Sequence, residues 1–242
     1  MLKQKHHPDF IVANAENAAS GRGITEKIAN ELFEAGIDGL TMGNHTWDKK
    51  DIFNFIDQEE RMVRPANFPS GTPGRGFTVL KKNKKHLVIA NLQGRTFLPP
   101  LECPFVVADR IVEEVKAKYN CILIDFHAEA TSEKIAMGWH MDGKVSALLG
   151  THTHVQTHDE TILPEGTAYV TDVGMVGPSE GVLGVDREAV LRKFKTQLPV
   201  RFSPAKGLWH FHAILVTIDE ATGKATDVRL IRIHENDLMF HS

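Results

Sequence analysis

Polar side chains able to bind metal ions or transfer protons recur where apolar segments of the chain end. They are Glu16-Asn17, Asn44-His45, His127, His152 and His154. A carboxylate has two oxygens and can bridge two cations, and a neutral amide oxygen suits a hard cation that already has negative ligands. His45 follows Asn44 directly, so its imidazole would point away from the amide, toward whatever lies above the metal. The set indicates a metal site with an imidazole beside it.

Each of these residues alone also has an ordinary structural explanation. Gly-Asn favours turns, a carboxylate after a strand commonly caps a helix, and a histidine there is commonly a hydrogen-bonded surface residue. His152 and His154 lie two apart, so they share a face in extended backbone and can address two ions in a turn. The shared position of all five clusters after apolar strands favours the metal site, because the carboxyl ends of parallel strands meet at one edge of a sheet.

The elements that must position these residues alternate between strands and helices, with two hairpins. We expect strands at residues 9–15, 38–42, 77–80, 86–92, 121–126, 145–149, 167–171, 210–218 and 226–234. We expect helices at residues 25–36, 49–56, 106–119, 131–139 and 186–195, with Thr25, Asp48 and Asp186 as caps. This order predicts an α/β fold in which two mixed sheets pack together between helices, within one domain covering residues 1–242.

The length and composition are those of a globular domain with a full core. The 242 residues carry a net charge of −3, which gives no sign of a nucleic-acid or membrane surface, and the two cysteines are too few for a disulfide framework. No apolar run reaches the length of a membrane span, and residues 1–7 lack the apolar core of a signal peptide, so we expect a cytoplasmic protein. Thirteen histidines are the unusual feature.

Seven motifs resemble those of the calcineurin-like metallophosphoesterases, in particular their YmdB-type bacterial branch. They are NAENAA at 14–19, TMGNHTWD at 41–48, RPANFP at 64–69, NLQGR at 91–95, DFHAEATSE at 125–133, GTHTHVQ at 150–156 and TDVGM at 171–175. The resemblance extends from about residue 8 to the tail. It implies an α/β/β/α sandwich with a dinuclear centre, in which the metals are iron, with manganese or zinc as substitutes.

The resemblance also implies a role for each residue. Glu16 would bridge the two metals, and Asn17 and His154 would bind the first. The second metal would be held by Asn44, His127 and His152, and His45 would be the catalytic histidine. The implied reaction is metal-hydroxide attack on the phosphorus of a 2′,3′-cyclic nucleotide or related phosphodiester, with His45 protonating the departing ribose oxygen.

The beginning of the chain departs from the family pattern. The family opens with a strand ending in Gly-Asp-Val-x-Gly, whose aspartate binds the first metal, and a helix follows. Residues 1–8 resemble the end of that helix, and no Gly-Asp-Val precedes Glu16. We therefore expect the sandwich to lack its first strand, the first metal to bind less tightly than the second, and the phosphodiesterase activity of this chain to be weak.

Two other hypotheses remain open at this point. A truncated chain, or one with a misplaced start site, could be a weakly active or inactive remnant that binds one metal or a protein partner. Metal-dependent amidohydrolases also use His-x-His, but on their first strand, whereas here the pair comes last. The expected partner is a small nucleotide or phosphodiester, and association into homo-oligomers is left open. Trp47, Arg95 and Phe97 are candidates for base recognition, although packing or loop scaffolding is the better explanation of each.

Overall fold

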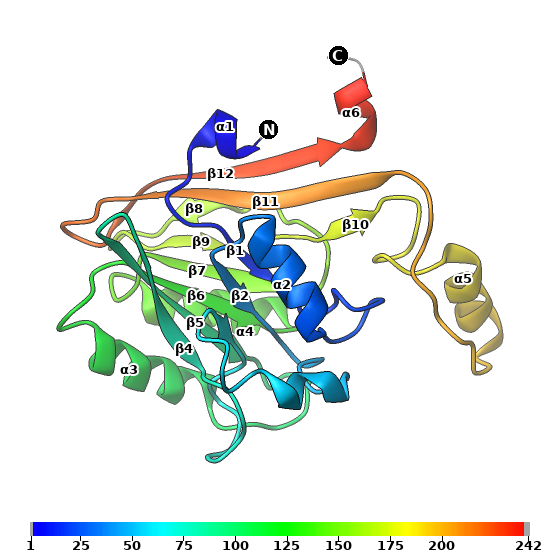
Figure 1. The fold of residues 1–242 in the computed structure, drawn as a ribbon, viewed down its shortest axis with the longest axis horizontal. Helices are drawn as coiled ribbons and strands as arrows, with labels where there is room; N and C mark the ends of the chain where they lie inside the picture. The colour runs from blue at the N-terminus through cyan, green and yellow to red at the C-terminus, as the bar shows by residue number, and fades with distance from the viewer. Residues whose placement is uncertain (1, 240–242) are drawn as a thin grey trace.

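The computed structural model describes residues 2–239 (Figure 1). Its helices are α1 (Leu2–His6), α2 (Glu26–Glu34), α3 (Pro104–Val115), α4 (Thr131–Met141), α5 (Arg187–Thr196) and α6 (Glu235–Met239), with a 3₁₀ turn η1 (Lys50–Asn54). Its strands are β1 (Val12–Asn14), β2 (Gly39–Thr41), β3 (Met62–Val63), β4 (Phe77–Lys82), β5 (Lys85–Gln93), β6 (Ile122–His127), β7 (Ala147–Thr151), β8 (Thr161–Ile162), β9 (Ala168–Val170), β10 (Val176–Pro178), β11 (Trp209–Ile218) and β12 (Ala225–His234).

A six-stranded mixed sheet forms the centre of the fold, in the order β4-β5-β6-β7-β9-β8. Strands β5, β6, β7 and β9 are parallel, and the two edge strands are antiparallel to their neighbours. Side chains alternate along each strand. In β5, Val88, Ala90 and Leu92 pack against the core beneath α3 and α4, while Leu87 and Ile89 face the opposite side. Both faces of this sheet are therefore covered.

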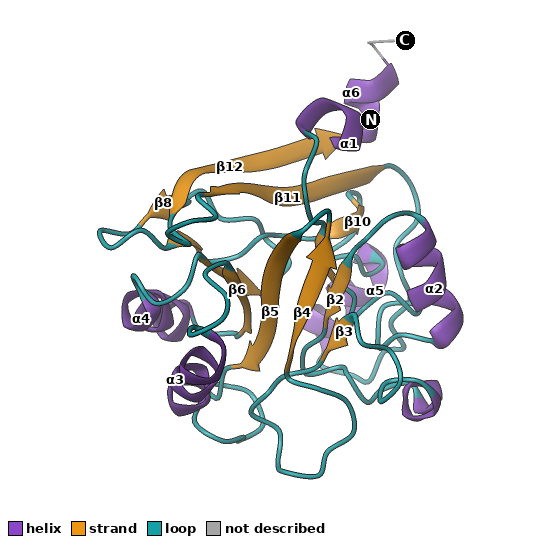
Figure 2. Cartoon of the chain, turned by 60° about the vertical axis from the view of Figure 1, so that its left-hand side comes forward, coloured by secondary structure: helices purple, strands orange, loops and turns teal. Residues whose placement is uncertain are grey.

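Two three-stranded sheets cover the second face of the central sheet. The parallel sheet β1-β2-β3 packs on β4 and β5, and the antiparallel sheet β10-β11-β12 packs on β7 and β9. Leu123 of β6 contacts both clusters, so the two small sheets lie next to each other. Helix α2 packs outside β1-β2-β3 through Ile28, Ala29 and Leu32, and Figure 2 shows it on the side opposite α3 and α4.

The expected mixed α/β architecture of sheets flanked by helices is confirmed, but the expectation of two sheets is wrong in one respect. Within residues 2–239, β1 pairs with β2 and β11 pairs with β10 and β12, and no ladder joins β1 to β11. The layer that faces the central sheet is therefore split into two hydrogen-bonded units. The segment expected to end a helix before β1 is helical, as α1.

Several local expectations are confirmed. Asn83 and Lys84 both have positive φ, as a two-residue turn of the β4–β5 hairpin requires. Strands β11 and β12 form the expected antiparallel hairpin. Thr25 and Asp186 cap α2 and α5 by accepting from the N–H groups of Ile28 and Ala189.

The expected helix at residues 49–56, capped by Asp48, is wrong. The segment forms the single 3₁₀ turn η1, which has no side-chain cap, because the Asp48 carboxylate contacts His45 instead.

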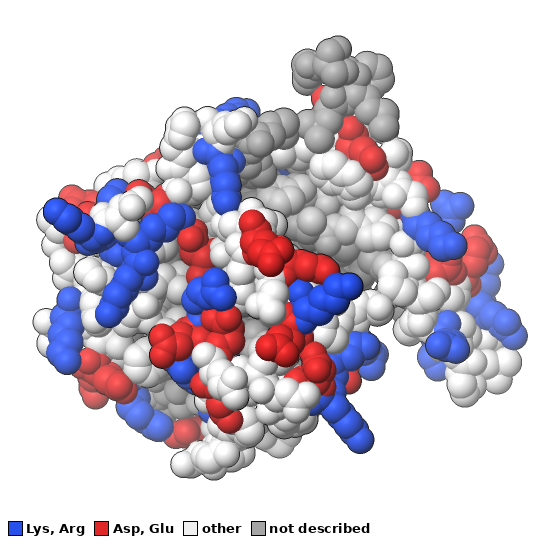
Figure 3. Space-filling model, in the orientation of Figure 1, with Lys and Arg blue, Asp and Glu red and all other residues white. Residues whose placement is uncertain are grey.

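Figure 3 shows cationic and anionic side chains interspersed over much of this face, with uncharged surface between them. No helix in the described part of the chain is long and apolar enough to cross a membrane.

Candidate metal centre

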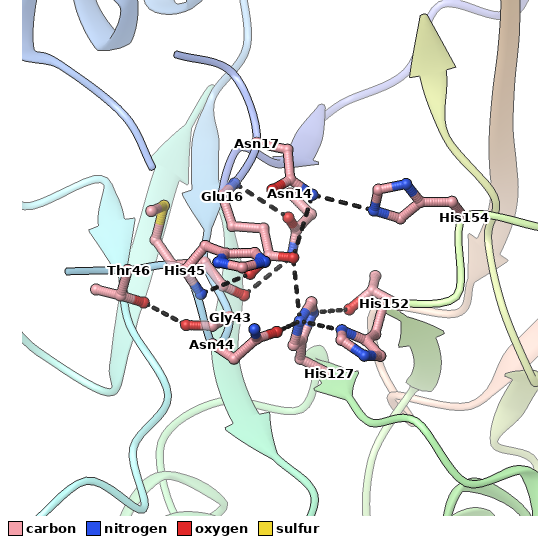
Figure 4. Close-up of polar contacts among 12 residues, drawn as sticks. Asn14, Glu16, Asn17, Gly43, Asn44, His45, Thr46, His127, His152 and His154 are labelled. Carbon is pink, nitrogen blue, oxygen red and sulfur yellow. Dashed lines mark hydrogen bonds and ion pairs between the residues drawn. The ribbon is translucent and has the colours of Figure 1, made fainter. Parts of the chain in front are cut away.

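The polar clusters identified in the sequence come together where β1, β2, β6 and β7 end (Figure 4). Glu16 and Asn17 follow β1, Asn44 and His45 follow β2, and His127 is the last residue of β6. His152 and His154 follow β7. Two strands of the small parallel sheet and two of the central sheet thus direct their carboxyl ends at one region, the place where open α/β sheets form their sites.

Three side-chain atoms with lone pairs converge on Nε2 of His127. This atom lies 2.8 Å from Oδ1 of Asn44, 3.1 Å from Oε1 of Glu16 and 3.0 Å from Nδ1 of His152. A ring nitrogen carries at most one proton, so it cannot satisfy three acceptors at once. The ligand atoms of Glu16, His127 and His152 all lie within 4.8 Å of one another. This excess of lone pairs in a buried space suits a cation.

Hydrogen bonds on the far side of His127 determine which nitrogen faces the cluster. Its Nδ1 lies 2.9 Å from the Thr151 hydroxyl, and that hydroxyl donates to Oδ1 of Asp125 at 2.6 Å. The hydroxyl proton is committed to Asp125, so Thr151 accepts a proton from Nδ1. Nε2 is then left with a lone pair directed at the cluster, the arrangement that a metal ligand requires.

His152 is arranged in the same way. Its Nε2 lies 2.9 Å from Oε2 of Glu129, so Nδ1 keeps the lone pair that faces His127. Burial, followed by the charge of His127, lowers the pKa of His152 to about 4, which leaves the ring neutral at pH 7. Its backbone φ is +103° and that of His154 is +66°. The left-handed backbone turns the two rings toward different partners.

His154 and Asn17 form the other part of the cluster. Nδ1 of His154 donates to the Leu183 carbonyl at 3.2 Å, and Nε2 accepts from Nδ2 of Asn17 at 3.0 Å. The buried Oδ1 of Asn17 has no hydrogen-bond partner within residues 2–239. A buried amide oxygen left unpaired normally costs stability, so its position beside Glu16 favours a cation there.

Glu16 connects the two parts. Its Oε1 contacts His127 and the Asn17 amide, and its Oε2 accepts the backbone N–H of His45. Burial would raise the pKa of Glu16, but the neighbouring His127 and the hydrogen bonds outweigh it and lower the pKa to about 2. Gly43 makes this packing possible, because a Cβ there would lie 2.4 Å from both Oε2 of Glu16 and Nε2 of His127.

His45 lies at the edge of the cluster and contacts it only through its backbone. Nδ1 of its ring lies 3.0 Å from Oδ2 of Asp48, and the Arg22 guanidinium is 4.0 Å from the same carboxylate. The carboxylate holds the proton on Nδ1 and leaves Nε2 to face a ligand. Metal-binding imidazoles and proton-transferring imidazoles both use such a partner. The position of His45 outside the converging donors of Glu16, His127 and His152 favours proton transfer.

The sequence analysis did not identify the buried residues that hydrogen-bond to the cluster and to the loops that carry it. Buried Asp125 accepts from the side chains of Asn14, Thr41 and Thr151, and burial raises its pKa. Buried Lys134 pairs with Asp172 at 2.8 Å. The signal was present, because Thr41, Asp125 and Thr151 are polar residues inside otherwise apolar strands.

Asp172 also positions the loop that carries the histidine pair. Its Oδ2 accepts from both the N–H and the hydroxyl of Thr153, the residue between His152 and His154.

The three residues considered for base recognition lie outside the cluster. Trp47 stacks on Phe53 with ring centroids 5.3 Å apart and contacts Phe68 edge-on. Arg95 is exposed, and its guanidinium reaches Sγ of Cys103. Phe97 has 86% of its surface exposed. Their surroundings are those of packing and loop residues.

Comparison with known proteins finds relatives over nearly the whole chain. Residues 1–231 match the family described as YmdB-like protein. A 2′,3′-cyclic-nucleotide 2′-phosphodiesterase from Bacillus subtilis (strain 168) is 56% identical over 239 residues, covering 99% of this chain and 90% of that protein. A solved hypothetical protein from Thermus thermophilus superposes with a TM-score of 0.91 at 40% identity, covering 97% of this chain and 90% of that one. The crystal structure of a novel phosphatase from Mycoplasma pneumoniae superposes with a TM-score of 0.90 at 36% identity. The match covers 96% of this chain and 85% of that one.

Proposed function

Since the chain belongs to the YmdB-like protein family, we propose that it is a metal-dependent phosphodiesterase that hydrolyses 2′,3′-cyclic nucleotides. The observation that carries the proposal is the convergence of donor atoms from Glu16, His127 and His152 within 4.8 Å of one another. The Asn17 amide contacts Glu16 through Nδ2, and its Oδ1 has no partner in the described part of the chain. The name of the Bacillus subtilis relative supports the substrate class, and the match covers nearly all of both proteins.

The donor set fits two cations. Glu16, Asn44, His127 and His152 would hold one ion, and Glu16, Asn17 and His154 would hold the other. The donors are oxygen and imidazole nitrogen without thiolate, a set that suits iron, manganese or zinc. We propose iron, on the basis of the family resemblance. The ion with four protein donors should bind more tightly than the ion with three.

The chain's own residues supply binding, orientation and a proton. Bound metal ions would add Lewis-acid activation of water and neutralisation of phosphoryl charge. With both ring nitrogens protonated, His45 is held by Asp48 through Nδ1–H and donates its second proton from Nε2 to the departing ribose oxygen, which leaves the ring neutral. General acid catalysis of this kind contributes about 10²–10⁴-fold. The Glu16 carboxylate accepts the backbone N–H of His45 and so fixes where this imidazole stands.

Neither alternative is favoured. An interaction protein without catalysis would not need imidazole nitrogens from His127 and His152 and the carboxylate of Glu16 within 4.8 Å of one another. An amidohydrolase would carry its His-x-His on the first strand of a barrel, whereas here the pair follows β7 of an open sheet.

Metal analysis and product analysis on the purified protein test the proposal together. We expect bound iron, and hydrolysis of 2′,3′-cyclic AMP to a nucleoside monophosphate that is abolished by chelation and restored by adding metal. His152→Ala should lose both metal and activity, while His158→Ala, on an exposed loop, should keep both. Hydrolysis of an amide substrate in place of the cyclic nucleotide, or a metal-free protein that binds no added ion, would refute the proposal.

A further inference from the structure

A cavity lies next to the metal centre, and His154 belongs to both. Its volume is about 330 Å³, at the lower end of the ~300–1,000 Å³ range typical of small-molecule sites. Nε2 of His154 contacts Asn17 of the metal centre, and the residue also lines the cavity. We call this cavity the histidine pocket, since His210, His212 and His234 of the β11–β12 hairpin line its opposite wall.

The three histidines of the hairpin project from one face of it. His210 and His212 are two residues apart in β11, and His234 of β12 is paired with His210 in the ladder. The His210 and His212 rings stack with centroids 4.3 Å apart and 16° between their planes, and His234 meets His210 edge-on at 6.0 Å. Together they form an aromatic surface of ring faces and ring nitrogens.

These rings present uncharged hydrogen-bonding groups. The buried Nε2 of His210 and Nδ1 of His212 have no partner in the described part of the chain. Burial, followed by the charges of the neighbouring histidines, lowers the pKa of both rings, that of His212 to about 4. At neutral pH each ring therefore offers one N–H donor and one acceptor nitrogen. This chemistry matches the edge of an uncharged heterocycle better than it matches an anion.

The remaining wall adds one rigid donor and an apolar surface. Arg232 donates from Nε to Oε1 of Gln156 at 2.5 Å and from Nη2 to the Gln156 carbonyl at 3.2 Å, which fixes its guanidinium. Met175 and Leu183 supply the apolar part of the lining. Planar rings with donors, acceptors and a thioether beside them are the usual surroundings of a bound base.

The pocket is not arranged as another metal site. Within residues 2–239, Glu16, His127 and His152 are the one set of three or more His, Cys, Asp or Glu groups whose donor atoms converge. The histidines of the hairpin stack face to face instead, which directs their lone pairs in roughly parallel planes.

We propose that the histidine pocket binds the nucleobase of the substrate while the phosphoryl group lies at the metal centre. The inference rests on the proposed function, because it assigns the second half of the same nucleotide to the neighbouring cavity. His154 then lies between the two halves, because its Nε2 contacts Asn17 of the metal centre and the residue lines the pocket. Trp47, Arg95 and Phe97, which the sequence suggested for this role, do not line the pocket.

Binding measurements test the inference independently of catalysis. Calorimetry would compare adenosine 3′-monophosphate with ribose 3-phosphate, which has the same phosphate and no base. We expect the wild type to bind the nucleotide roughly tenfold more tightly or better, the contribution of one stacked base. His212→Ala should remove most of that preference and leave ribose 3-phosphate unaffected. His210→Phe keeps the ring shape and should retain stability while weakening nucleotide binding. His158→Ala is the surface control.

Hydrolysis rates with two cyclic phosphates, one with a base and one without, distinguish an error in this inference from an error in the proposed function. With 2′,3′-cyclic AMP and methyl riboside 2′,3′-cyclic phosphate, His212→Ala should raise KM for the first alone. Equal wild-type affinity for the ligands with and without a base would overturn the inference even in an active enzyme. An equal loss of inorganic phosphate binding in the variant would also overturn it, because the pocket would then hold a phosphate. If neither ester is cleaved but the base preference depends on His212, the inference stands and the proposed reaction fails.

Discussion

The Thr151 hydroxyl lies 2.9 Å from Nδ1 of His127 and accepts its proton, because its own proton is donated to Asp125. Backbone pairing of His127 with Thr151 across β6 and β7 sets this contact. Thr151→Val keeps the shape but removes the acceptor, so the lone pair on Nε2 is no longer fixed. We expect metal affinity to fall roughly 10–100-fold. Metal titration checks this, and Thr151→Ser should bind like the wild type. Unchanged affinity in the valine variant would show that the hydroxyl does not orient the ring.

His45 and His152 should respond differently to removal. His45→Ala leaves the donor cluster intact, so metal content should be retained while turnover falls about 10²–10⁴-fold, the usual contribution of a general acid. His152→Ala removes a donor 3.0 Å from His127 and should lower metal content and turnover together. Elemental analysis beside steady-state kinetics distinguishes the two. Equal metal loss would make His45 a ligand or a structural residue.

The buried ion pair beneath the histidine loop should matter for stability. The side chains of Lys134 and Asp172 are 0% and 1% exposed, and their charged atoms are 2.8 Å apart. Lys134→Met leaves a buried carboxylate without its cation, which typically costs roughly 3–5 kcal/mol. Lys144→Met is the matched control, because Lys144 and Asp109 form an ion pair of the same 2.8 Å separation but both side chains are 39% exposed. Its loss should cost less than about 1 kcal/mol of stability. Denaturant unfolding of both variants measures the difference, and similar losses would contradict the role of burial.

His212 should make stability depend on pH. Burial lowers its folded-state pKa to about 4, below the ordinary value of 6.5. Between those values the unfolded chain binds a proton that the folded chain does not, so stability is complete above pH 6.5 and declines as pH falls toward 4. His212→Asn removes this group, and its stability should decline less over that interval. Urea unfolding of both proteins at pH 7 and pH 4.5 gives the comparison. Parallel declines would place the pKa near its ordinary value.

We also propose that residues 1–242 form one domain. The central sheet contributes to every hydrophobic cluster except the one beneath α2, and Leu123 links the two small sheets to it. Thermal unfolding followed by far-UV and near-UV circular dichroism should therefore give one coincident transition. Two separated transitions would show that the β10-β11-β12 sheet unfolds independently.

The sequence predicted the long elements and failed where strands are short. Strands β5, β6, β11 and β12 have enough alternating or continuous apolar residues to be recognised from pattern alone. Strands β3 and β8 contain two residues each, too few to show any period. The segment around the 3₁₀ turn η1 has helical spacing at Ile52, Phe53 and Ile56. Asp48 contacts His45 and does not cap the segment, and the spacing of apolar residues cannot predict that contact.

The donor residues were predictable, whereas their partners were not. Glu16, Asn44, His127 and the histidine pair can be found because each follows an apolar strand. Their contacts with Asp125, Thr151 and Glu129 depend on strand register and on loop geometry, which become visible only in three dimensions. His210 and His212 also form a His-x-His pair, but they lie within an alternating strand rather than after one, so the pair alone does not connect them to the site. They meet His154 because the hairpin packs across the sheet that carries it.

His152 and His154 hold left-handed backbone, at φ +103° and +66°, which costs residues with a Cβ about 1–3 kcal/mol each. Glycine would adopt that backbone freely at either position, and at residue 152 it would also remove one of the lone pairs that face His127. An inactivating change here would thus leave a folded chain that chaperones and proteases have no reason to remove. Glycine alleles at these two codons should abolish function at normal protein abundance, whereas missense alleles at Lys134 should lower abundance itself.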